Sequence, residues 1–383
     1  MSVTAAAGFR AAGVAAGLKA SGAPDVAVVV NDGPAAAAAG VFTANRVQAA
    51  PVLWSRQVLR GGLVRAVVLN SGGANACTGP QGFQDTHATA EAAAGLLAVS
   101  AGEVAVCSTG LIGELLPMDK LLGGVGEAVA CLDAAGGEAA AEAIRTTDTR
   151  SKTAVRPCGA ATVGGMAKGA GMLAPGLATM LVVLTTDAVA DAALLDRVLR
   201  TATEVTFDRI DADGCMSTND TVLLLASGAS GHAAEEAELA AAVTEVCADL
   251  AAQLLADAEG ATKEVAVRVV HAADTADAVE VGRSVARNNL LKCALFGQDP
   301  NWGRVLAAVG TTRATFDPDA LGVAINGIQV CSRGAADQPR DLVDLTGRDV
   351  EIVVDLQAGD AAATIWTTDL TYDYVHENSA YST

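Results

Sequence analysis

The sequence is poor in aromatic side chains and in histidine, and its cysteines are widely spaced. Aromatic residues make up 3% of the 383 residues, so the 51% hydrophobic content comes mostly from small aliphatic side chains. The four histidines lie far apart, which excludes the spacings typical of a histidine metal site or a histidine-assisted nucleophile. No two of the eight cysteines are closer than 24 residues, so CxxC metal and redox motifs are absent. We therefore expect no metal, no cofactor, and buried thiols in a reducing, cytoplasmic compartment.

Basic residues and long apolar runs are also scarce. The chain has 25 Lys plus Arg against 44 Asp plus Glu, a formal net charge of −19. Such a surface repels phosphate backbones and anionic lipids, so we expect no nucleic-acid partner. The apolar runs fall well short of the roughly 18 residues needed to cross a bilayer, so we expect no membrane partner. Residues 11–18 imitate a short signal-peptide core, but Arg10 and Lys19 flank them and secretion is not expected.

Patterns typical of strands and helices alternate along the chain, which indicates an α/β or α+β fold. Strands are expected at 25–30, 66–69, 103–107, 180–184 and 264–270, and helices at 85–98, 191–203 and 233–257. Two hairpins are expected, one over 322–330 around Asn326-Gly327 and one that joins 350–356 to 361–370. The composition changes near 256–263. This predicts a larger catalytic domain, 1–256, and a smaller C-terminal α/β domain, 257–383.

Two of the expected strands run directly into polar loops. NSGGANACTG (70–79) follows one strand, and STGLIGELLP (108–117) follows the other. Backbone N–H groups in a Ser-Thr-Gly turn can stabilise an oxyanion, and a loop rich in Gly and Asn can face a substrate. On residue types alone, ordinary turns are the simpler explanation of both loops.

The central stretch, residues 168–186, joins a glycine-rich turn to a short apolar run. The glycines allow close backbone approach, and Pro175 discourages a helix across the turn. Thr179 stands where turn and strand meet. Its residue type favours an ordinary strand threonine, and the alternative is a nucleophile at the mouth of a sheet. Lys168 precedes the glycines, so the stretch is not a P-loop.

Nine motifs spread over the whole chain occur together in one order. They are GFRAAGVAAGLK (8–19), NSGGANACTG (70–79), STGLIGELLP (108–117), TTDT (146–149), MAKGAGMLAPGLATML (166–181), DGCMSTNDT (213–221), EGATK (259–263), DPNWGR (299–304) and YVHENSAYST (374–383). In this order they resemble the ornithine acetyltransferase family, also called glutamate N-acetyltransferase. Several motifs in order are far more specific than any one of them.

The resemblance implies stacked sheets with flanking helices, in the manner of N-terminal-nucleophile enzymes. It implies self-cleavage between Ala178 and Thr179, which gives an α chain, 1–178, and a β chain, 179–383, assembled as α2β2. Thr179 would then be the nucleophile. Its new α-amine, with a pKa near 7.7–8.0, would be its general base, which fits the lack of a suitable histidine.

The implied reaction is a ping-pong transfer of acetyl from N2-acetyl-L-ornithine to L-glutamate, as part of arginine biosynthesis. The oxyanion hole maps to Thr109 and Gly110. Substrate-binding positions map to Thr146, Lys168, Thr179, Glu259, Asn378 and Thr383. We expect Lys168 to pair with a substrate carboxylate and Glu259 with the side-chain ammonium of ornithine. The family usually has Asn where this chain has Gly73, so position 73 is assigned no role.

Two other functions remain open on the sequence. One is a related N-terminal-nucleophile amidohydrolase or aminopeptidase, in which water replaces glutamate as the acceptor. The other is an uncleaved binding or structural protein with the same fold. The sequence also leaves open whether acetyl-CoA serves as a second acetyl donor.

Overall fold

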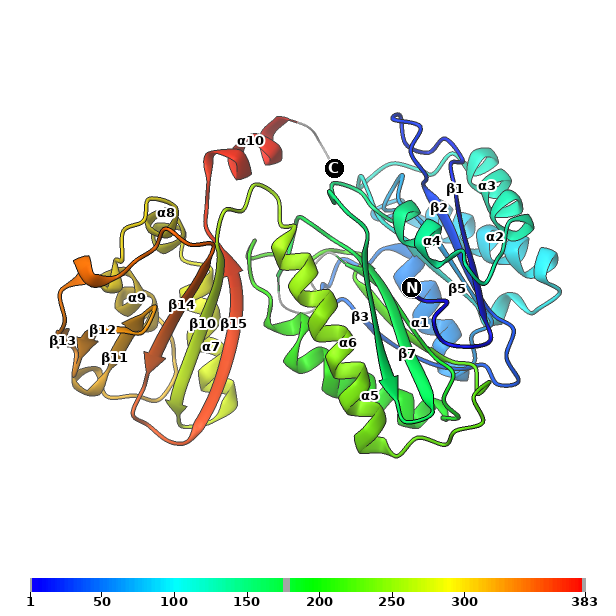
Figure 1. Ribbon diagram of the computed structural model, residues 1–383. Coiled ribbons are helices and arrows are strands. Elements are labelled where there is room, and N and C mark those ends of the chain that lie inside the picture. The colour runs from blue at the N-terminus through cyan, green and yellow to red at the C-terminus, as the bar shows by residue number, and fades with distance from the viewer. Residues whose placement is uncertain (1, 175–179, 381–383) are drawn as a thin grey trace. The chain divides into compact units, whose positions relative to one another are not determined.

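The structure is a computed structural model that describes residues 2–174 and 180–380. Ala178, Thr179 and Thr383 therefore lie outside the described residues. The chain divides into two compact units, which are described separately. The first contains residues up to 208 together with 215–257, and the second contains 209–214 and the described residues from 258 onward (Figure 1). The expected mixed α/β class with several sheets is confirmed.

The first unit is built on two sheets. One has the order β1-β2-β4-β5, from Phe9–Val14, Val26–Asn31, Ala66–Asn70 and Val104–Ser108. The other has the order β3-β9-β8-β7-β6, from Ala37–Phe42, Thr221–Ala226, Leu181–Thr186, Ala161–Lys168 and Lys152–Cys158. Valine and leucine dominate the central strands, and all six residues of β2, β8 and β9 are buried, as expected for strands covered on both faces.

The two sheets share one apolar core. It joins residues such as Val28 and Val67 of the first sheet to Met166, Val183 and Leu223 of the second. This confirms the expected stacking of sheets. Helices α1 to α4 contact the first sheet; they span Ala50–Val58, Gly79–Leu97, Met118–Ala130 and Gly137–Ala143. Helices α5 and α6 pack together against the second sheet; they span Ala192–Val205 and Glu236–Ala256.

Helix α2 begins earlier than the sequence pattern predicts. The pattern predicts a start at residue 85, but the helix starts at Gly79, and Pro80 stands in its first turn, where proline is favoured. Thr86 lies inside the helix, where its hydroxyl donates to the carbonyl oxygen of Gly82 at 2.9 Å. The predicted start was wrong because this threonine bonds back along the helix and does not cap it.

Among the described helices, α6 alone is long and apolar enough to cross a bilayer, judged by length and composition. Its buried side chains include Leu239, Val243, Val246 and Leu250, which recur at three- and four-residue spacing. This stripe packs on β6 and β7. In this fold, the apolar character of α6 therefore supplies the packing between helix and sheet.

The second unit holds a six-stranded sheet with the order β13-β12-β11-β14-β10-β15. These strands span Ala335–Ala336, Ile328–Ser332, Gly322–Ile325, Asp349–Asp355, Glu264–Ala272 and Ala361–Thr368. Its helices are α7 (Thr275–Ala286), α8 (Asn289–Phe296), α9 (Trp302–Val309) and α10 (Tyr372–Ala380). Short 3-10 turns in the described chain occur at Leu59–Gly61, Ala101–Glu103, Phe207–Arg209, Pro318–Ala320 and Arg340–Leu342.

Of the two expected hairpins, one is confirmed and one is wrong. Strands β11 and β12 form the first, and Asn326 and Gly327 have φ values of 45° and 81°, as a tight hairpin turn requires. The second was expected between β14 and β15. Instead β10 lies between them, parallel to β14 and antiparallel to β15. A strand distant in sequence thus replaced the local pairing.

The thiols are less uniformly buried than expected. Cys107, Cys158, Cys247 and Cys331 are buried. Cys77, Cys131, Cys215 and Cys293 are exposed, so the expectation is wrong for half of the cysteines.

Candidate active site

The two polar loops of the first unit meet because their strands pair in parallel. Asn70 at the end of β4 stands opposite Ser108 at the end of β5. Parallel strands bring their carboxyl ends to the same edge, where ligands commonly bind in α/β sheets. The Ser108 hydroxyl hydrogen-bonds to the side chain of Asn70, which ties the starts of the two loops together.

Thr109 and Gly110 are held against the neighbouring loop by backbone contacts. The Thr109 amide donates to the Asn70 carbonyl oxygen at 3.0 Å, and the Gly73 amide donates to the Thr109 carbonyl oxygen at 3.0 Å. Gly110 has φ of +129°, and a Cβ there would stand 2.7 Å from the Gly73 nitrogen. Gly110 therefore allows the close approach of the two loops. At Gly73, which received no role from the sequence, a Cβ would instead stand 2.8 Å from Leu116 Cδ2.

These contacts decide which groups of the turn can face a ligand. The Thr109 amide is already used by Asn70, so Thr109 can contribute only its hydroxyl. Within the described part of the chain, the Gly110 amide meets no hydrogen-bond acceptor. The turn thus offers one hydroxyl and one backbone N–H, the donor pair that an oxyanion requires.

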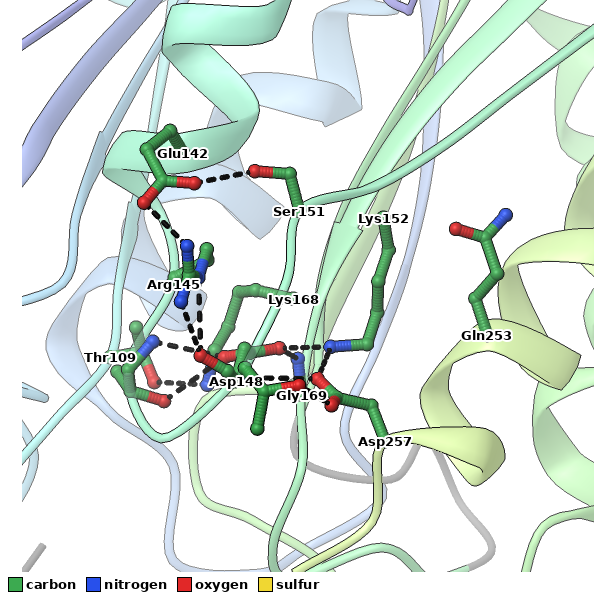
Figure 2. Close-up of polar contacts among 12 residues, drawn as sticks. Thr109, Glu142, Arg145, Asp148, Ser151, Lys152, Lys168, Gly169, Gln253 and Asp257 are labelled. Atoms are coloured by element: carbon green, nitrogen blue, oxygen red, sulfur yellow. Dashed lines mark hydrogen bonds and ion pairs between the residues drawn. The ribbon is translucent and has the colours of Figure 1, made fainter.

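Lys168 brings a buried positive charge to this turn. It is the last residue of β7 and is 2% exposed, and its Nζ donates to Thr109 Oγ1 at 3.3 Å (Figure 2). Lys168 also pairs in register with Leu181, so β8 starts beside it. Because the ammonium group can only donate, the Thr109 oxygen accepts from Lys168, and its own O–H is left to donate elsewhere. The structure thereby joins two of the predicted site residues.

Thr146 reaches the same region through a buried carboxylate that sequence reasoning did not single out. The Thr146 amide donates to Asp148 Oδ2 at 2.9 Å, and the Gly169 amide donates to Asp148 Oδ1 at 2.6 Å. Burial disfavours ionisation of Asp148, but the Lys168 and Lys152 ammonium groups outweigh it and hold the pKa of Asp148 below its usual range.

A second carboxylate completes this charged group. Lys152 Nζ lies 2.6 Å from Asp148 Oδ1 and 2.6 Å from Asp257 Oδ2 (Figure 2). The Lys152 side chain is entirely buried, and Asp257 also accepts from the amide and hydroxyl of Thr149. The sequence placed Asp148 in a cluster of hydroxyls and Asp257 at a helix end. Nothing in their spacing revealed that one lysine bridges them.

Asp220 anchors the first described residue of the central strand. The Met180 amide donates to Asp220 Oδ1 at 3.1 Å, and Asp220 is fully buried. Burial raises the pKa of Asp220 well above its ordinary value, although this amide and the Lys168 charge act in the opposite direction. Over residues 2–174 and 180–380, its Oδ2 atom has no hydrogen-bond partner. A buried carboxyl with a raised pKa thus contacts Met180, the residue that follows Thr179 in the chain.

Two further predicted residues belong to the second unit, and they lie on adjoining segments. The Thr371 hydroxyl donates to the carbonyl oxygen of Gly260 at 2.6 Å, so the chain next to Glu259 touches the start of α10. Asn378 lies on α10, where its side-chain amide donates to the Tyr374 carbonyl oxygen at 3.0 Å. Partial burial raises the pKa of Glu377, and the negative charges of Glu259 and Asp373 raise it further.

The structure therefore places the predicted site residues in two groups. Thr109, Gly110, Thr146 and Lys168 form one group in the first unit, and Glu259 and Asn378 form another in the second. Ala178, Thr179 and Thr383 lie outside the described residues. Among the residues that are described, no cluster of three or more His, Cys, Asp or Glu side chains is placed to hold a metal ion.

Comparison with known proteins gives matches over the full chain. A model of the ArgJ family matches residues 10–383. A protein of Streptomyces avermitilis named "Arginine biosynthesis bifunctional protein ArgJ" is 70% identical over 382 residues, which cover 100% of both chains. A protein of the same name from Mycobacterium tuberculosis is 61% identical over 388 residues, covering 99% of this chain and 96% of the relative.

Two solved structures are also similar in sequence. Ornithine acetyltransferase from Mycobacterium tuberculosis, crystallised in complex with ornithine, is 61% identical, with a TM-score of 0.44. That match covers 47% of this chain and 96% of the solved chain. An arginine biosynthesis bifunctional protein from Bacillus halodurans is 34% identical, with a TM-score of 0.49, and covers 51% of this chain and 97% of its own.

The state of Asp220 can be tested through stability. At pH 7 we expect Asp220→Asn to be no less stable than the unmodified chain, because the amide oxygen still accepts the Met180 N–H and nothing must bind a proton. Asp220→Leu leaves that amide unsatisfied and should be about 1–3 kcal/mol less stable than the asparagine variant. Denaturant unfolding of the three proteins measures both differences.

The pH dependence of stability tests independently whether the pKa of Asp220 is raised in the folded chain. Because the pKa of Asp220 is raised in the folded chain, its contribution to stability is complete below the unfolded pKa, near 3.9, and declines as pH rises toward the folded pKa. Asparagine does not titrate. The melting temperature of the unmodified chain minus that of Asp220→Asn should therefore increase as pH falls from about 7 to about 4. A decrease would mean that Asp220 is ionised in the fold.

Proposed function

The chain belongs to the ArgJ family, and we propose that it is an acyltransferase of arginine biosynthesis that moves the acetyl group of N2-acetyl-L-ornithine onto L-glutamate. The products are L-ornithine and N-acetyl-L-glutamate. The acetyl group passes through an ester on Thr179, so the two amino acids bind in turn. The hydrolase alternative uses the same intermediate but gives acetate, and no feature of the described residues favours it.

One observation carries this proposal. Lys168, whose ammonium group donates to the Thr109 hydroxyl oxygen, pairs in register with Leu181 at the start of β8, and Thr179 is the second residue before that strand. A donor pair with a cation behind it suits a reaction in which negative charge develops on a carbonyl oxygen. Acyl transfer to a hydroxyl is such a reaction.

Self-cleavage supplies the nucleophile. In the precursor, Thr179 Oγ attacks the Ala178 carbonyl carbon, the peptide C–N bond breaks, and the Thr179 nitrogen takes up the hydroxyl proton. Water then hydrolyses the ester, which frees the carboxylate of Ala178 and leaves the amine of Thr179. The resulting chains, 1–178 and 179–383, remain together, and we propose an α2β2 assembly in the cytoplasm.

Acetyl transfer repeats this chemistry with external substrates. The Thr179 α-amine accepts the proton of its own hydroxyl while Oγ attacks the acetyl carbon of acetylornithine. The C–N bond to ornithine then breaks, and the departing nitrogen receives that proton. In the second half, the amine of glutamate attacks the acetyl ester, and Thr179 Oγ leaves as a hydroxyl. No other base is needed, because the pKa of an α-amine lies close to neutral pH.

Besides its predicted contact with a substrate carboxylate, Lys168 supports the oxyanion donors. By donating to Thr109 Oγ1, it directs the Thr109 O–H toward the developing oxyanion and makes that hydroxyl a stronger donor. We propose that Thr146, Glu259, Asn378 and Thr383 bind the amino-acid parts of the substrates, with Glu259 facing the side-chain ammonium of ornithine.

The activity is tested by incubating the purified chain with N2-acetyl-L-ornithine and L-glutamate and measuring ornithine and N-acetylglutamate by mass spectrometry. We expect equal amounts of both products. A second reaction with acetyl-CoA and glutamate decides whether the chain also has the second activity that the word "bifunctional" in its relatives' names suggests. Acetate without N-acetylglutamate would establish the hydrolase instead.

The role of Thr179 is tested by substitution. Thr179→Ala should leave the chain in one piece and abolish transfer, because no hydroxyl remains. Thr179→Ser should be cleaved and keep part of the activity. Intact mass spectrometry of the denatured protein reports cleavage. Thr201→Ala makes the same change on the exposed face of α5 and should alter neither property. Normal cleavage of the Thr179→Ala variant would refute the mechanism.

The Thr109 hydroxyl can be tested separately from its backbone. Because Asn70 already occupies the Thr109 amide, only the side chain can serve as a donor. Thr109→Val should therefore lower kcat by about 10²–10³, the usual cost of one oxyanion donor. Thr109→Ser keeps the hydroxyl and should retain most of the rate, and Thr201→Val is the control. Equal rates for the valine and serine variants would leave Gly110 as the only donor.

A further inference from the structure

A buried, electrically balanced group of charges lies behind the candidate active site. It contains the ammonium groups of Lys152 and Lys168 and the carboxylates of Asp148 and Asp257, and each of these residues is at most 9% exposed. Two positive and two negative charges sum to zero. Such a group tolerates burial only while the balance is kept, because an unpaired charge in the interior is strongly destabilising.

The two carboxylates of this group hold different parts of the chain. Asp257 contacts Lys152 and the amide and hydroxyl of Thr149. Asp148 contacts Lys152 and, with separate oxygens, the amides of Thr146 at 2.9 Å and Gly169 at 2.6 Å. Asp148 thus clamps the two segments that carry the predicted substrate residues Thr146 and Lys168. Asp257 clamps neither.

Only a carboxylate can hold both of these amides. Each oxygen of Asp148 accepts one backbone N–H, whereas the side chain of asparagine has a single acceptor and would turn its NH₂ toward the other amide. The contacts of Asp257 can be kept when asparagine replaces it. An asparagine there can accept the Thr149 amide and donate to the Thr149 hydroxyl, which rotates to accept.

The two carboxylates also balance different lysines. Lys152 lies 2.6 Å from both carboxylates, so Asp257 can balance it alone. Asp148 is then the counter-charge of Lys168, whose positive charge also lowers the pKa of Asp148 against the effect of burial. Lys168 donates to Thr109 Oγ1, so the charge on Asp148 affects this oxyanion donor through Lys168 and not by direct contact (Figure 2).

We propose that Asp148 is a positioning residue for the acyl-transfer site, which fixes Thr146 and Lys168 relative to Thr109 through its two backbone contacts and its charge. Lys152 and Asp257 complete the charge balance around Asp148 and have no direct part in binding. This inference rests on the proposed function for the identity of the substrates.

Two double variants isolate the role of Asp148. Lys152→Met with Asp257→Asn leaves Asp148 and Lys168 as a balanced pair. Lys152→Met with Asp148→Asn leaves Asp257 and Lys168, again balanced. Both variants remove the same ammonium and convert one buried Asp to Asn, so they differ only in which carboxylate remains. Their melting temperatures, intact masses, transfer kinetics and calorimetric affinity for L-ornithine are compared with those of the unmodified chain.

We expect the variant that keeps Asp148 to stay within about threefold of the unmodified kcat/KM and ornithine affinity. The variant that loses Asp148 should fall by about 10² in kcat/KM, the usual cost of displacing reacting groups by about 1 Å. It should also bind ornithine at least tenfold more weakly, with a melting temperature close to that of its partner variant. Failure of self-cleavage in this variant alone would support the same role.

Equal transfer and equal ornithine affinity in the two double variants would overturn the proposal, as would a larger loss in the variant that keeps Asp148. If a double variant does not accumulate as folded protein, the single substitutions Asp148→Asn and Asp257→Asn provide the same comparison. The unmodified chain separates the two levels of inference. If it transfers no acetyl group, the proposed function fails, and the difference in ornithine affinity still decides whether Asp148 positions the site.

Discussion

A lysine ammonium group can be buried only where an opposite charge or a set of hydrogen-bond acceptors replaces its water. This constraint shapes the interior of the first unit. Lys152 and Lys168 are both buried there, Lys152 at the start of β6 and Lys168 at the end of the neighbouring strand β7. Asp148 and Asp257 must therefore be buried with them. Once these four side chains are in place, the loop at 146, the turn at 169 and the hydroxyl of Thr109 have little freedom to move. The geometry of the site follows from the need to neutralise two lysines.

The second unit meets the same constraint in another way. Lys263 is buried, and its Nζ donates to the carbonyl oxygens of Leu345 and Gly347 at 2.7 Å and of Thr346 at 3.3 Å. Backbone carbonyls satisfy this ammonium and fasten a loop to the start of β10. Lys292 is also buried, and its Nζ donates to the carbonyl oxygen of Ala212 and to the Thr368 hydroxyl. The first unit instead places carboxylates beside Lys152, and those carboxylates also accept hydrogen bonds from backbone amides of the loops.

The parts of this organisation that depend on local sequence could be predicted. The strand at 180–184, the long helix after 233 and the Asn326-Gly327 hairpin follow from hydrophobic period and turn chemistry, and all three are present. The pairing of β10 between β14 and β15 was missed, because strand order depends on contacts between distant segments. Constraints on single residues were missed for the same reason. Gly110, for example, must be glycine because the backbone of Gly73, from the neighbouring loop, stands against it.

The motifs of the sequence pointed to residues that are predicted to bind a substrate, but not to the side chains that hold those residues in place. Asp148 and Asp257 are 109 positions apart and share one lysine, a relation that no spacing rule contains. Asp220 is similar: its contact with the Met180 amide arises because β9 lies beside β8 in a parallel pair. Side chains that support others are set by tertiary pairing, so their identification requires the fold. Several of the predicted site residues, such as Thr109, Gly110 and Thr146, lie in loops, where the residue types themselves carry a signal.

The scarcity of histidine can be understood from this arrangement. In a common hydrolase triad, a histidine takes the proton of the nucleophile and a carboxylate orients the histidine. A threonine at a chain start, as proposed for Thr179, carries hydroxyl and amine in one residue and needs no third group to align them. The orienting carboxylate is then available for the other half of the reaction, the stabilisation of the oxyanion. In the proposed arrangement, Asp148 acts through Lys168 on Thr109. The carboxylate that orients the general base in a triad is therefore used here to support an oxyanion donor.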